Sequence, residues 1–134
     1  YSMFHRNPET EGILQQAKDA GSGLIAFSPL AQGLLTDRYL NGIPQDSRAA
    51  RDFSLKKDSI TEETLAKIRA LNDIAVQRGQ TLAQMALAWI LSNSLVTSVI
   101  VGASSIGQLD SNLQSIRNTS FSAEEIEQIN ALTI

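Results

Sequence analysis

Two segments of the sequence place small, hydroxyl-bearing and amide-bearing residues where an anionic ligand could bind. The first spans residues 27–35 and reads Phe-Ser-Pro-Leu-Ala-Gln-Gly-Leu-Leu, directly after a short apolar run. Functional loops gather at the carboxyl ends of parallel strands, because backbone amides and short side chains emerge there together. The Ser28 hydroxyl could donate to a phosphate, but a simple turn at Ser28 and Pro29 accounts for the same residues equally well. The local pattern leaves both interpretations open.

The second segment begins at Gly102, where another apolar run passes into a helical pattern. Gly102 would let a ligand approach the backbone, Ser104 offers a hydroxyl group, and the unpaired amides of a helix start favour an anion. Asn112 follows Gln108 by one helical turn, so both side chains could face one ligand. The alternative is an ordinary helix start in which Ser105 and Gln108 form a capping box, and the pattern by itself favours that alternative.

Residues suited to other kinds of catalysis or to metal binding do not cluster in the sequence. His5 is the single histidine and the chain has no cysteine, so a histidine-based triad or metal centre has too few members. Glu9, Glu62 and Glu125 fall in the first turns of predicted helices, where an acidic side chain complements the helix dipole. We therefore predict no catalytic residue and no metal ligand in this chain.

The elements that must position the two segments are short strands. Residues 24–27 are wholly apolar and bounded by glycine on one side and Ser-Pro on the other, and residues 96–101 are rich in valine and isoleucine. Such runs are typical of parallel strands that are covered on both faces. We therefore predict two buried strands, each followed directly by one of the candidate segments.

Helix signals occupy most of the remaining sequence. Asn7, Pro8 and an acidic first turn predict a helix that is capped by Asn7 and ends at Gly21. The other predicted helices run from Ser59 or Thr61 to Gly79, from the capping box of Thr81 and Gln84 through Ile90, over residues 106–116, and from Ser122 through Leu132. The second and third of these helices are expected to pack together.

The alternation of helices with short buried strands predicts an α/β fold with a parallel sheet or barrel. Two clear strands, and the end of a third at residues 1–6, are too few to close a barrel, which typically needs about 250 residues. The chain also begins without a methionine. We therefore predict that residues 1–134 are one piece of a larger domain.

Composition argues against several classes of partner. Of the 134 residues, 43% are hydrophobic, and the formal net charge of -3 comes from interleaved acidic and basic residues. No basic face is available for a nucleic-acid backbone. No apolar run is long enough to span a membrane, and no secretory leader is visible. We expect a cytoplasmic protein with neither a nucleic-acid partner nor a membrane partner.

The two candidate segments together resemble the aldo-keto reductase superfamily. The resemblance rests on residues 28–35, on Val-Gly-Ala-Ser at residues 101–104, and on Gln108, Leu109 and Asn112. Residues 39–44 with Ser47 and Arg48, and residues 78–89, also match. They are most similar to the branch that contains bacterial L-glyceraldehyde 3-phosphate reductase-like enzymes and the β-subunits of voltage-gated potassium channels. These motifs occur in the right order, and the resemblance covers nearly the whole chain.

The resemblance implies a (β/α)8 barrel that binds NADP(H) across the carboxyl ends of its strands and reduces aldehydes or ketones by hydride transfer. This chain would be the C-terminal portion of that barrel, about two to three βα units plus a C-terminal helix. Tyr1 would stack on the nicotinamide, the loop after the seventh strand would follow the pyrophosphate, and Arg38 would neutralise phosphate charge. Arg48 would lie in a loop that folds over the cofactor.

The junction after the eighth strand would hold the adenosine end and its 2′-phosphate. In full, the cofactor-binding residues that the resemblance implies are Tyr1, Ser28, Pro29, Leu30, Ala31, Gln32, Gly33, Arg38, Arg48, Gly102, Ser104, Gln108 and Asn112. Three positions depart from the family pattern. Ser111 replaces a frequent glutamate near the adenine, Asp46 replaces an aromatic residue of some channel-type relatives, and Ser105 replaces a basic residue of many NADPH-preferring relatives.

The resemblance places the catalytic tyrosine, lysine, aspartate and histidine of the family on earlier strands, upstream of Tyr1. Neither Tyr39 nor His5 lies in a matching motif. We therefore expect a fragment that is inactive alone and belongs to an enzyme acting on a small carbonyl substrate. The alternative is a non-catalytic, nucleotide-binding regulatory subunit of the same fold. Exposed strand edges would also allow self-association.

Overall fold

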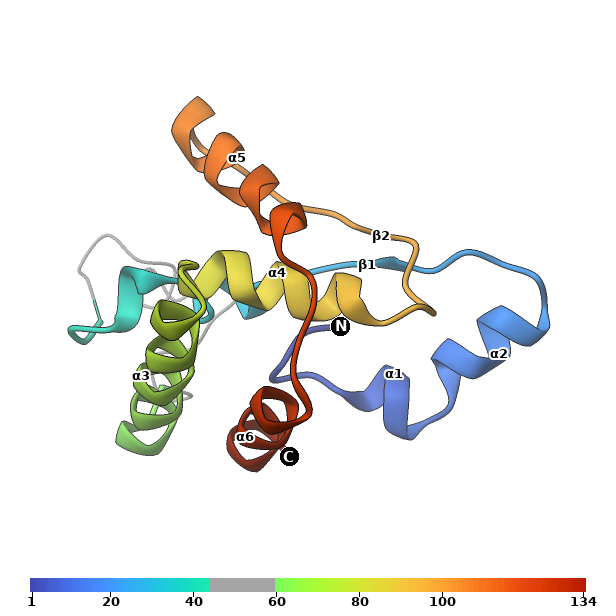
Figure 1. Cartoon of the computed structure of the whole chain (residues 1–134), viewed down its shortest axis with the longest axis horizontal. Helices are drawn as coiled ribbons and strands as arrows, with labels where there is room; N and C mark the ends of the chain where they lie inside the picture. Colours follow the sequence, from blue (N-terminus) through green and yellow to red (C-terminus); the bar gives the residue numbers. More distant parts are fainter. Residues whose placement is uncertain (44–59) are drawn as a thin grey trace.

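The computed structural model describes residues 1–43 and 60–134, in which two parallel strands lie against a set of helices. Strand β1 (Ile25–Ala26) pairs with β2 (Ser98–Val99) in the register Ile25 to Ser98 and Ala26 to Val99. Beyond the strands, the Ile100 amide donates to the Ala26 carbonyl at 2.9 Å. Figure 1 shows the two strands side by side, although two long helices separate them in the chain. The predicted parallel pairing is confirmed, with strands shorter than predicted.

The described helices cover one face of the strand pair, which corrects the prediction that both faces are buried. Ala26 is 2% exposed, whereas Ile25 is 61% exposed and Phe27 is 74% exposed. Successive side chains of a strand point to opposite faces, so Ala26 lies on the covered face and its two neighbours lie on the open face. An apolar run of four residues does not by itself show which faces the same chain covers.

The first predicted helix is in fact two short helices, α1 (Asn7–Thr10) and α2 (Ile13–Asp19). Gly12 separates them because its φ of 74° is left-handed, a conformation that interrupts a right-handed helix. Asn7 is the first residue of α1 and not its cap, which corrects a second prediction. The Asn7 side-chain amide instead donates to the Glu11 carboxylate at 2.9 Å.

The two central helices are α3 (Glu62–Gln77), which starts after Thr61, one of its two predicted caps, and α4 (Leu82–Ser92), which extends two residues past Ile90. The Thr61 hydroxyl caps α3 by accepting from the Thr64 amide at 3.1 Å. Gly79 follows α3 with a left-handed φ of 68°, and the Gln80 amide reaches back to the Ala75 carbonyl at 2.9 Å, which closes a Schellman motif. The capping box of Thr81 at the start of α4 is also confirmed.

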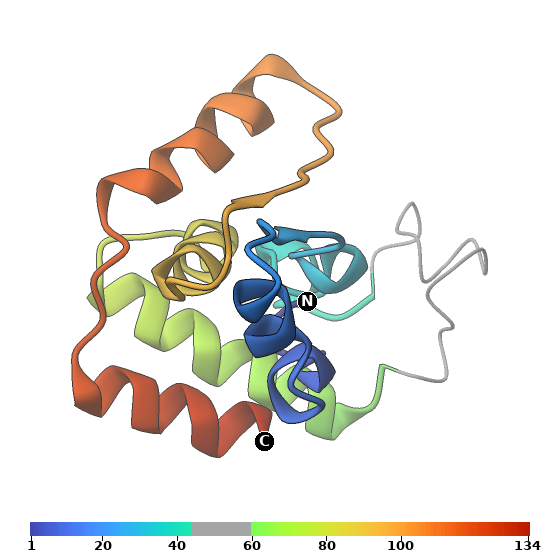
Figure 2. The same ribbon diagram turned by 90° about the vertical axis from the view of Figure 1, so that its right-hand side faces the viewer.

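Helix α4 lies at the centre of the described fold, between α5 (Ile106–Leu113) and α3, as Figure 2 shows. Every residue of α4 from Met85 to Ile90 is buried. On the far side of α3 lies α6 (Ala123–Thr133), which begins with a capping box formed by Ser122 and Glu125. The predicted packing of α3 against α4 is confirmed, and α6 extends the same helical layer.

Three short 3-10 turns complete the described chain: η1 (Ala31–Gly33), η2 (Asp37–Tyr39) and η4 (Gln114–Arg117). The last of these replaces the final turn of the predicted helix over residues 106–116, so that α5 ends at Leu113. Within residues 1–43 and 60–134, no helix combines the length and the apolar character that crossing a membrane requires.

Candidate functional site

The two candidate segments leave the sheet at the same edge. Strand β1 leads directly into residues 27–35, and β2 leads toward α5 through residues 100–105. Because β1 and β2 are parallel neighbours, their carboxyl ends lie together, and Figure 1 shows both strands running in the same direction. The fold therefore brings together the points from which the two segments leave the sheet, although these points lie about 70 residues apart in the sequence.

The segment after β1 has an unusual backbone conformation. Ser28, Ala31 and Gln32 all have left-handed φ values, of 55°, 47° and 60°. Each costs on the order of 1–3 kcal/mol in a residue other than glycine, and such strain gathers at ligand-binding and catalytic sites. Local bonds hold the conformation, including one from the Gly33 amide to the Leu30 carbonyl at 2.9 Å. This segment is therefore more elaborate than the simple Ser-Pro turn that was the alternative.

Gln32 has a buried side-chain oxygen, Oε1, with no hydrogen-bond partner among the described residues. Leaving a buried acceptor unsatisfied costs about 1–3 kcal/mol. Neighbouring Pro29 and Ala31 are buried, while Ser28, Leu30 and Gly33 are half-buried. A ligand that carried a hydrogen-bond donor into this segment would satisfy the Gln32 oxygen.

The segment after β2 forms a small hydrogen-bonded unit at the start of α5. The Ser105 hydroxyl caps the helix by accepting from the Gln108 amide at 3.1 Å. The Gln108 side-chain oxygen accepts from the Ser104 amide at 2.7 Å and from the Ser104 hydroxyl at 3.0 Å. The reciprocal capping box of Ser105 and Gln108 is thus only half formed, because the glutamine side chain binds Ser104 instead. Ser104 and Gln108 act as one unit.

Gly102 and Asn112 differ in their surroundings. A Cβ atom added to Gly102 would meet no atom within 4 Å, so packing inside the described chain does not require glycine there. Asn112 is 6% exposed, and its Nδ2 has no hydrogen-bond partner among the described residues. Gln108 is exposed although it lies one helical turn away. A ligand that contacted both side chains would therefore have to reach a surface group and a buried amide.

Tyr1 lies beside the end of β1, but its ring points to the helical layer. The Tyr1 amino group donates to the Phe27 carbonyl at 3.0 Å. Its ring lies 5.5 Å from the ring of Trp89, and its hydroxyl donates to the Glu9 carboxylate. Burial, followed by the bond to Glu9, raises the pKa of the Tyr1 phenol well above its ordinary value. The predicted stacking of Tyr1 on a nicotinamide stays a prediction.

Of the two arginines predicted near phosphate groups, Arg38 is the one that lies among the described residues. Arg38 is exposed in η2, where its amide donates to the Thr36 hydroxyl at 3.3 Å. Arg48 lies outside the described residues, as does Asp46. Over the described ranges, no three histidine, cysteine or acidic side chains gather into a group able to hold a metal ion.

Sequence reasoning missed the second role of Gln84. Besides completing the capping box of Thr81, its side-chain nitrogen donates to the Ser111 carbonyl at 3.0 Å and to the Ser111 hydroxyl at 3.3 Å. The sequence indicated part of this role, because a glutamine in a capping box accepts a hydrogen bond through its side-chain oxygen and leaves its side-chain NH2 group free to donate. The partner could not be identified, because Ser111 lies 27 residues away in sequence.

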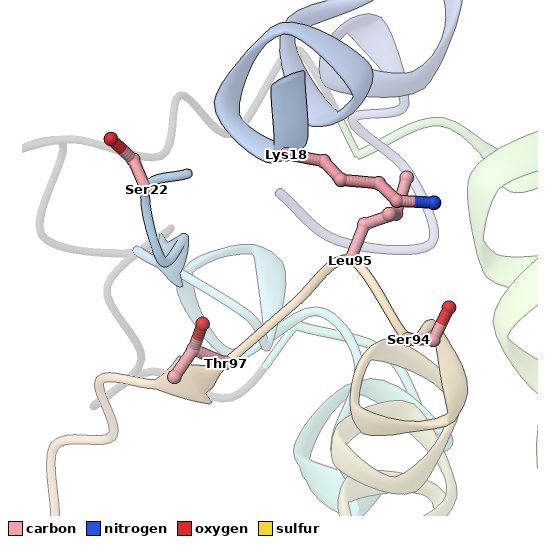
Figure 3. Close-up of a pocket in the computed structure, with 5 residues that line it drawn as sticks. All are labelled: Lys18, Ser22, Ser94, Leu95 and Thr97. Atoms are coloured by element: carbon pink, nitrogen blue, oxygen red, sulfur yellow. The ribbon is translucent and has the colours of Figure 1, made fainter. Parts of the chain in front are cut away.

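A shallow hollow of about 410 Å³ lies at the opposite edge of the sheet. It is lined by Lys18, Ser22, Ser94, Leu95 and Thr97, which Figure 3 shows between the end of α2, the end of α4 and the beginnings of the strands. The carboxyl-terminal ends of α2 and α4 disfavour an anion there. This hollow is separate from the candidate site, so substitution of a serine in its lining can serve as a control for substitutions in the candidate site.

Comparison with known proteins agrees with the motifs. The model of the aldo/keto reductase family matches residues 1–134. The chain is 48% identical over 133 residues to L-glyceraldehyde 3-phosphate reductase of Escherichia coli K12. The matched region covers 96% of this chain and 38% of that protein. It is 40% identical over 119 residues to a probable voltage-gated potassium channel subunit beta of Arabidopsis thaliana, covering 87% of this chain and 36% of that protein.

Solved structures show the same relationship. An aldo-keto reductase from Bacillus halodurans, in its holo form, superimposes with a TM-score of 0.72 at 27% identity, over 100% of this chain and 41% of that chain. A thermostable aldo-keto reductase in complex with the inhibitor epalrestat gives a TM-score of 0.65 at 26% identity, over 98% and 37%. The chain thus spans well under half the length of these relatives, and it belongs to the aldo/keto reductase family.

Proposed function

We propose that this chain carries much of the nucleotide site of an NADP(H)-dependent reductase of small aldehydes or ketones. In this proposal, residues 1–134 form the C-terminal part of a (β/α)8 barrel. The main support is that the strained segment and the segment carrying the Ser104–Gln108 unit follow the carboxyl ends of two paired parallel strands. Two orphaned polar atoms, Gln32 Oε1 and Asn112 Nδ2, fit a ligand rich in both donors and acceptors.

The proposed contacts divide between the two segments. Residues 28–33 would follow the pyrophosphate, where the Ser28 hydroxyl and backbone amides can donate to phosphate oxygens. Arg38 and Arg48 would supply positive charge. Gly102, Ser104, Gln108 and Asn112 would hold the adenosine end at the start of α5, where helix amides favour an anion. Tyr1 would orient the nicotinamide.

When bound, the reduced nicotinamide supplies the hydride for carbonyl reduction. The chain's own contribution is to bind and orient it, and we assign no proton donor to these 134 residues. Tyr39 is 1% exposed in the core, so it is not placed to protonate a substrate, and His5 lies in no motif that resembles a catalytic one. We therefore propose that the 134-residue chain by itself does not reduce carbonyl compounds.

A regulatory role is the second candidate, and the 40% identity to the probable potassium channel subunit beta favours it. A sensor of this kind would bind the same nucleotide in the same way. The two candidates differ in turnover, because a regulatory subunit would bind NADPH tightly without consuming it at a useful rate with any aldehyde.

The test compares the whole natural protein with a double variant, Ser104→Ala with Gln108→Ala. We expect the KM for NADPH to rise at least about tenfold with little change in kcat, since even one lost hydrogen bond to a charged group contributes about 1.5–3 kcal/mol. Ser94→Ala, on the opposite edge of the sheet, is the matched control and should change neither constant. An unchanged KM for NADPH in the double variant would refute the proposed site.

A further inference from the structure

Gln84 joins two helices through one side-chain amide. It lies in the first turn of α4, where its Oε1 accepts from the Thr81 amide at 3.0 Å, and the Thr81 hydroxyl accepts from the Gln84 amide at 3.2 Å. Its Nε2 then reaches α5 and donates to the Ser111 carbonyl at 3.0 Å. The oxygen fixes the start of α4, and the nitrogen fixes the position of α5 relative to it.

The first turns of α5 make little contact with the described chain, whereas the end of the helix, with Asn112 buried, and η4, with Ser115 buried, pack against α4. All residues from Ile106 to Asp110 are exposed, including Ile106 at 81%, and the helix stands clear of α3 and α6 in Figure 2. Across the described ranges, the hydrogen bonds that connect α4 to α5 are the two that Gln84 donates to Ser111. A bond to a backbone carbonyl limits both the rotation of α5 about its axis and its sliding along α4.

The proposed nucleotide contacts lie on this same helix and at its start. Ser104 and Gln108 form a unit at the first turn, and Asn112 directly follows the tethered Ser111. Asn112 keeps a buried Nδ2 with no partner in the described part of the chain, as expected for a group reserved for a ligand. A small rotation of α5 would move these three side chains together. The Ser111 hydroxyl, meanwhile, lies within bonding distance of Gln84.

We propose that Gln84 is a positioning residue for the nucleotide site. It holds α5 in the orientation in which Ser104, Gln108 and Asn112 can contact the same ligand. This inference rests on the proposed function, and it adds a residue of α4 that need not touch the nucleotide. Preorganisation of this kind lowers the ordering that the ligand must otherwise impose on binding. Its loss therefore weakens binding without changing the chemical step.

Gln84→Glu tests the proposal in the whole natural protein. A glutamate still completes the capping box with Thr81 and suits the helix start, but its carboxylate cannot donate to the Ser111 carbonyl. We expect the dissociation constant and the KM for NADPH to rise about three- to tenfold, the fold-change that one net hydrogen bond represents, with kcat unchanged. Amide hydrogen exchange of α5 should become faster in the nucleotide-free protein.

Gln80→Glu is the matched control. The Gln80 Nε2 also donates to a backbone carbonyl, that of Asn118 at 3.1 Å, and its Oε1 accepts from Arg78. This variant loses the same kind of bond at a residue that follows η4, beyond the end of α5, so it should leave NADPH binding and the exchange of the first turns of α5 unchanged. Equal weakening of NADPH binding in both variants, or an unchanged dissociation constant in Gln84→Glu, would overturn the proposal. Failure of the unmodified protein to bind NADPH would instead refute the proposed function, and this inference with it.

Discussion

Replacement of Arg78 should destabilise the fold more than replacement of any exposed arginine. Arg78 follows α3, and its side chain is 3% exposed. Its guanidinium pairs with the Glu125 carboxylate at 2.8 Å, donates to the Ser120 carbonyl at 2.9 Å, and lies 3.7 Å from the centre of the Phe121 ring. These contacts join the turn between α3 and α4 to the chain segment that leads into α6.

The expected size of the effect follows from these contacts. The Glu125 side chain is 27% exposed, so its ion pair contributes at most about 1 kcal/mol. Arg78→Ala would also deprive the Ser120 carbonyl and the Gln80 side-chain oxygen of donors, at about 1 kcal/mol each, and would remove a cation–π contact of about 0.5–1 kcal/mol. Because these contributions overlap, we expect a total loss of about 3 kcal/mol.

Urea unfolding followed by far-ultraviolet circular dichroism measures this loss as a lower midpoint at constant slope. Arg78→Lys should lose about half as much, because an ammonium group keeps the charge but not the planar set of donors. Arg69→Ala is the control, since exposed Arg69 makes a single hydrogen bond to the Leu40 carbonyl at 3.1 Å. A loss below 1 kcal/mol for Arg78→Ala, or equal losses for both alanine variants, would refute the reasoning.

Two further predictions concern pH and glycine. Burial opposes ionisation of Glu125, but hydrogen bonds from the Ser122 amide and Arg78 outweigh it and hold the pKa of Glu125 below its ordinary 4.5. Stability should therefore be lost as pH falls below 4.5, and Glu125→Gln should flatten that dependence in urea midpoints. Gly79→Ala should cost about 1 kcal/mol because of its left-handed φ, without affecting the KM for NADPH. Gly102→Ala should instead raise the KM for NADPH and leave stability unchanged, because a Cβ atom there meets no atom of the described chain. If both substitutions changed stability and KM in the same way, this prediction would be wrong.

Features set by neighbouring residues could be predicted from the sequence. The caps at Thr61, Thr81 and Ser122 each depend on a partner three residues ahead, and all three form as predicted. The stop at Gly79 is equally local, because glycine supplies the left-handed residue that a Schellman motif needs. The candidate segments were found for a similar reason, since each directly follows an apolar run.

Features set by distant contacts could not be predicted. Gly12 separates α1 from α2 with a left-handed φ, although a single glycine inside a helical pattern is often tolerated, so the surrounding fold decides whether it breaks the helix. The left-handed backbone of Ala31 and Gln32 depends on how the loop packs, because neither residue type favours that conformation. The half-open strand pair likewise depends on which elements cover each face.

The two halves of the candidate site are held by different means, and this has a consequence for binding. The segment after β1 is held by its own backbone bonds and by the burial of Pro29 and Ala31, so its strain is present before any ligand arrives. The start of α5 is exposed, and the amide of Gln84 joins this helix to α4 through Ser111, near its other end. Substitutions in the first segment should therefore alter folding and binding together, whereas substitutions around α5 should alter binding alone. Loss of binding with a loss of stability in the first segment, and without one around α5, would show that two independently supported parts of the fold hold one ligand.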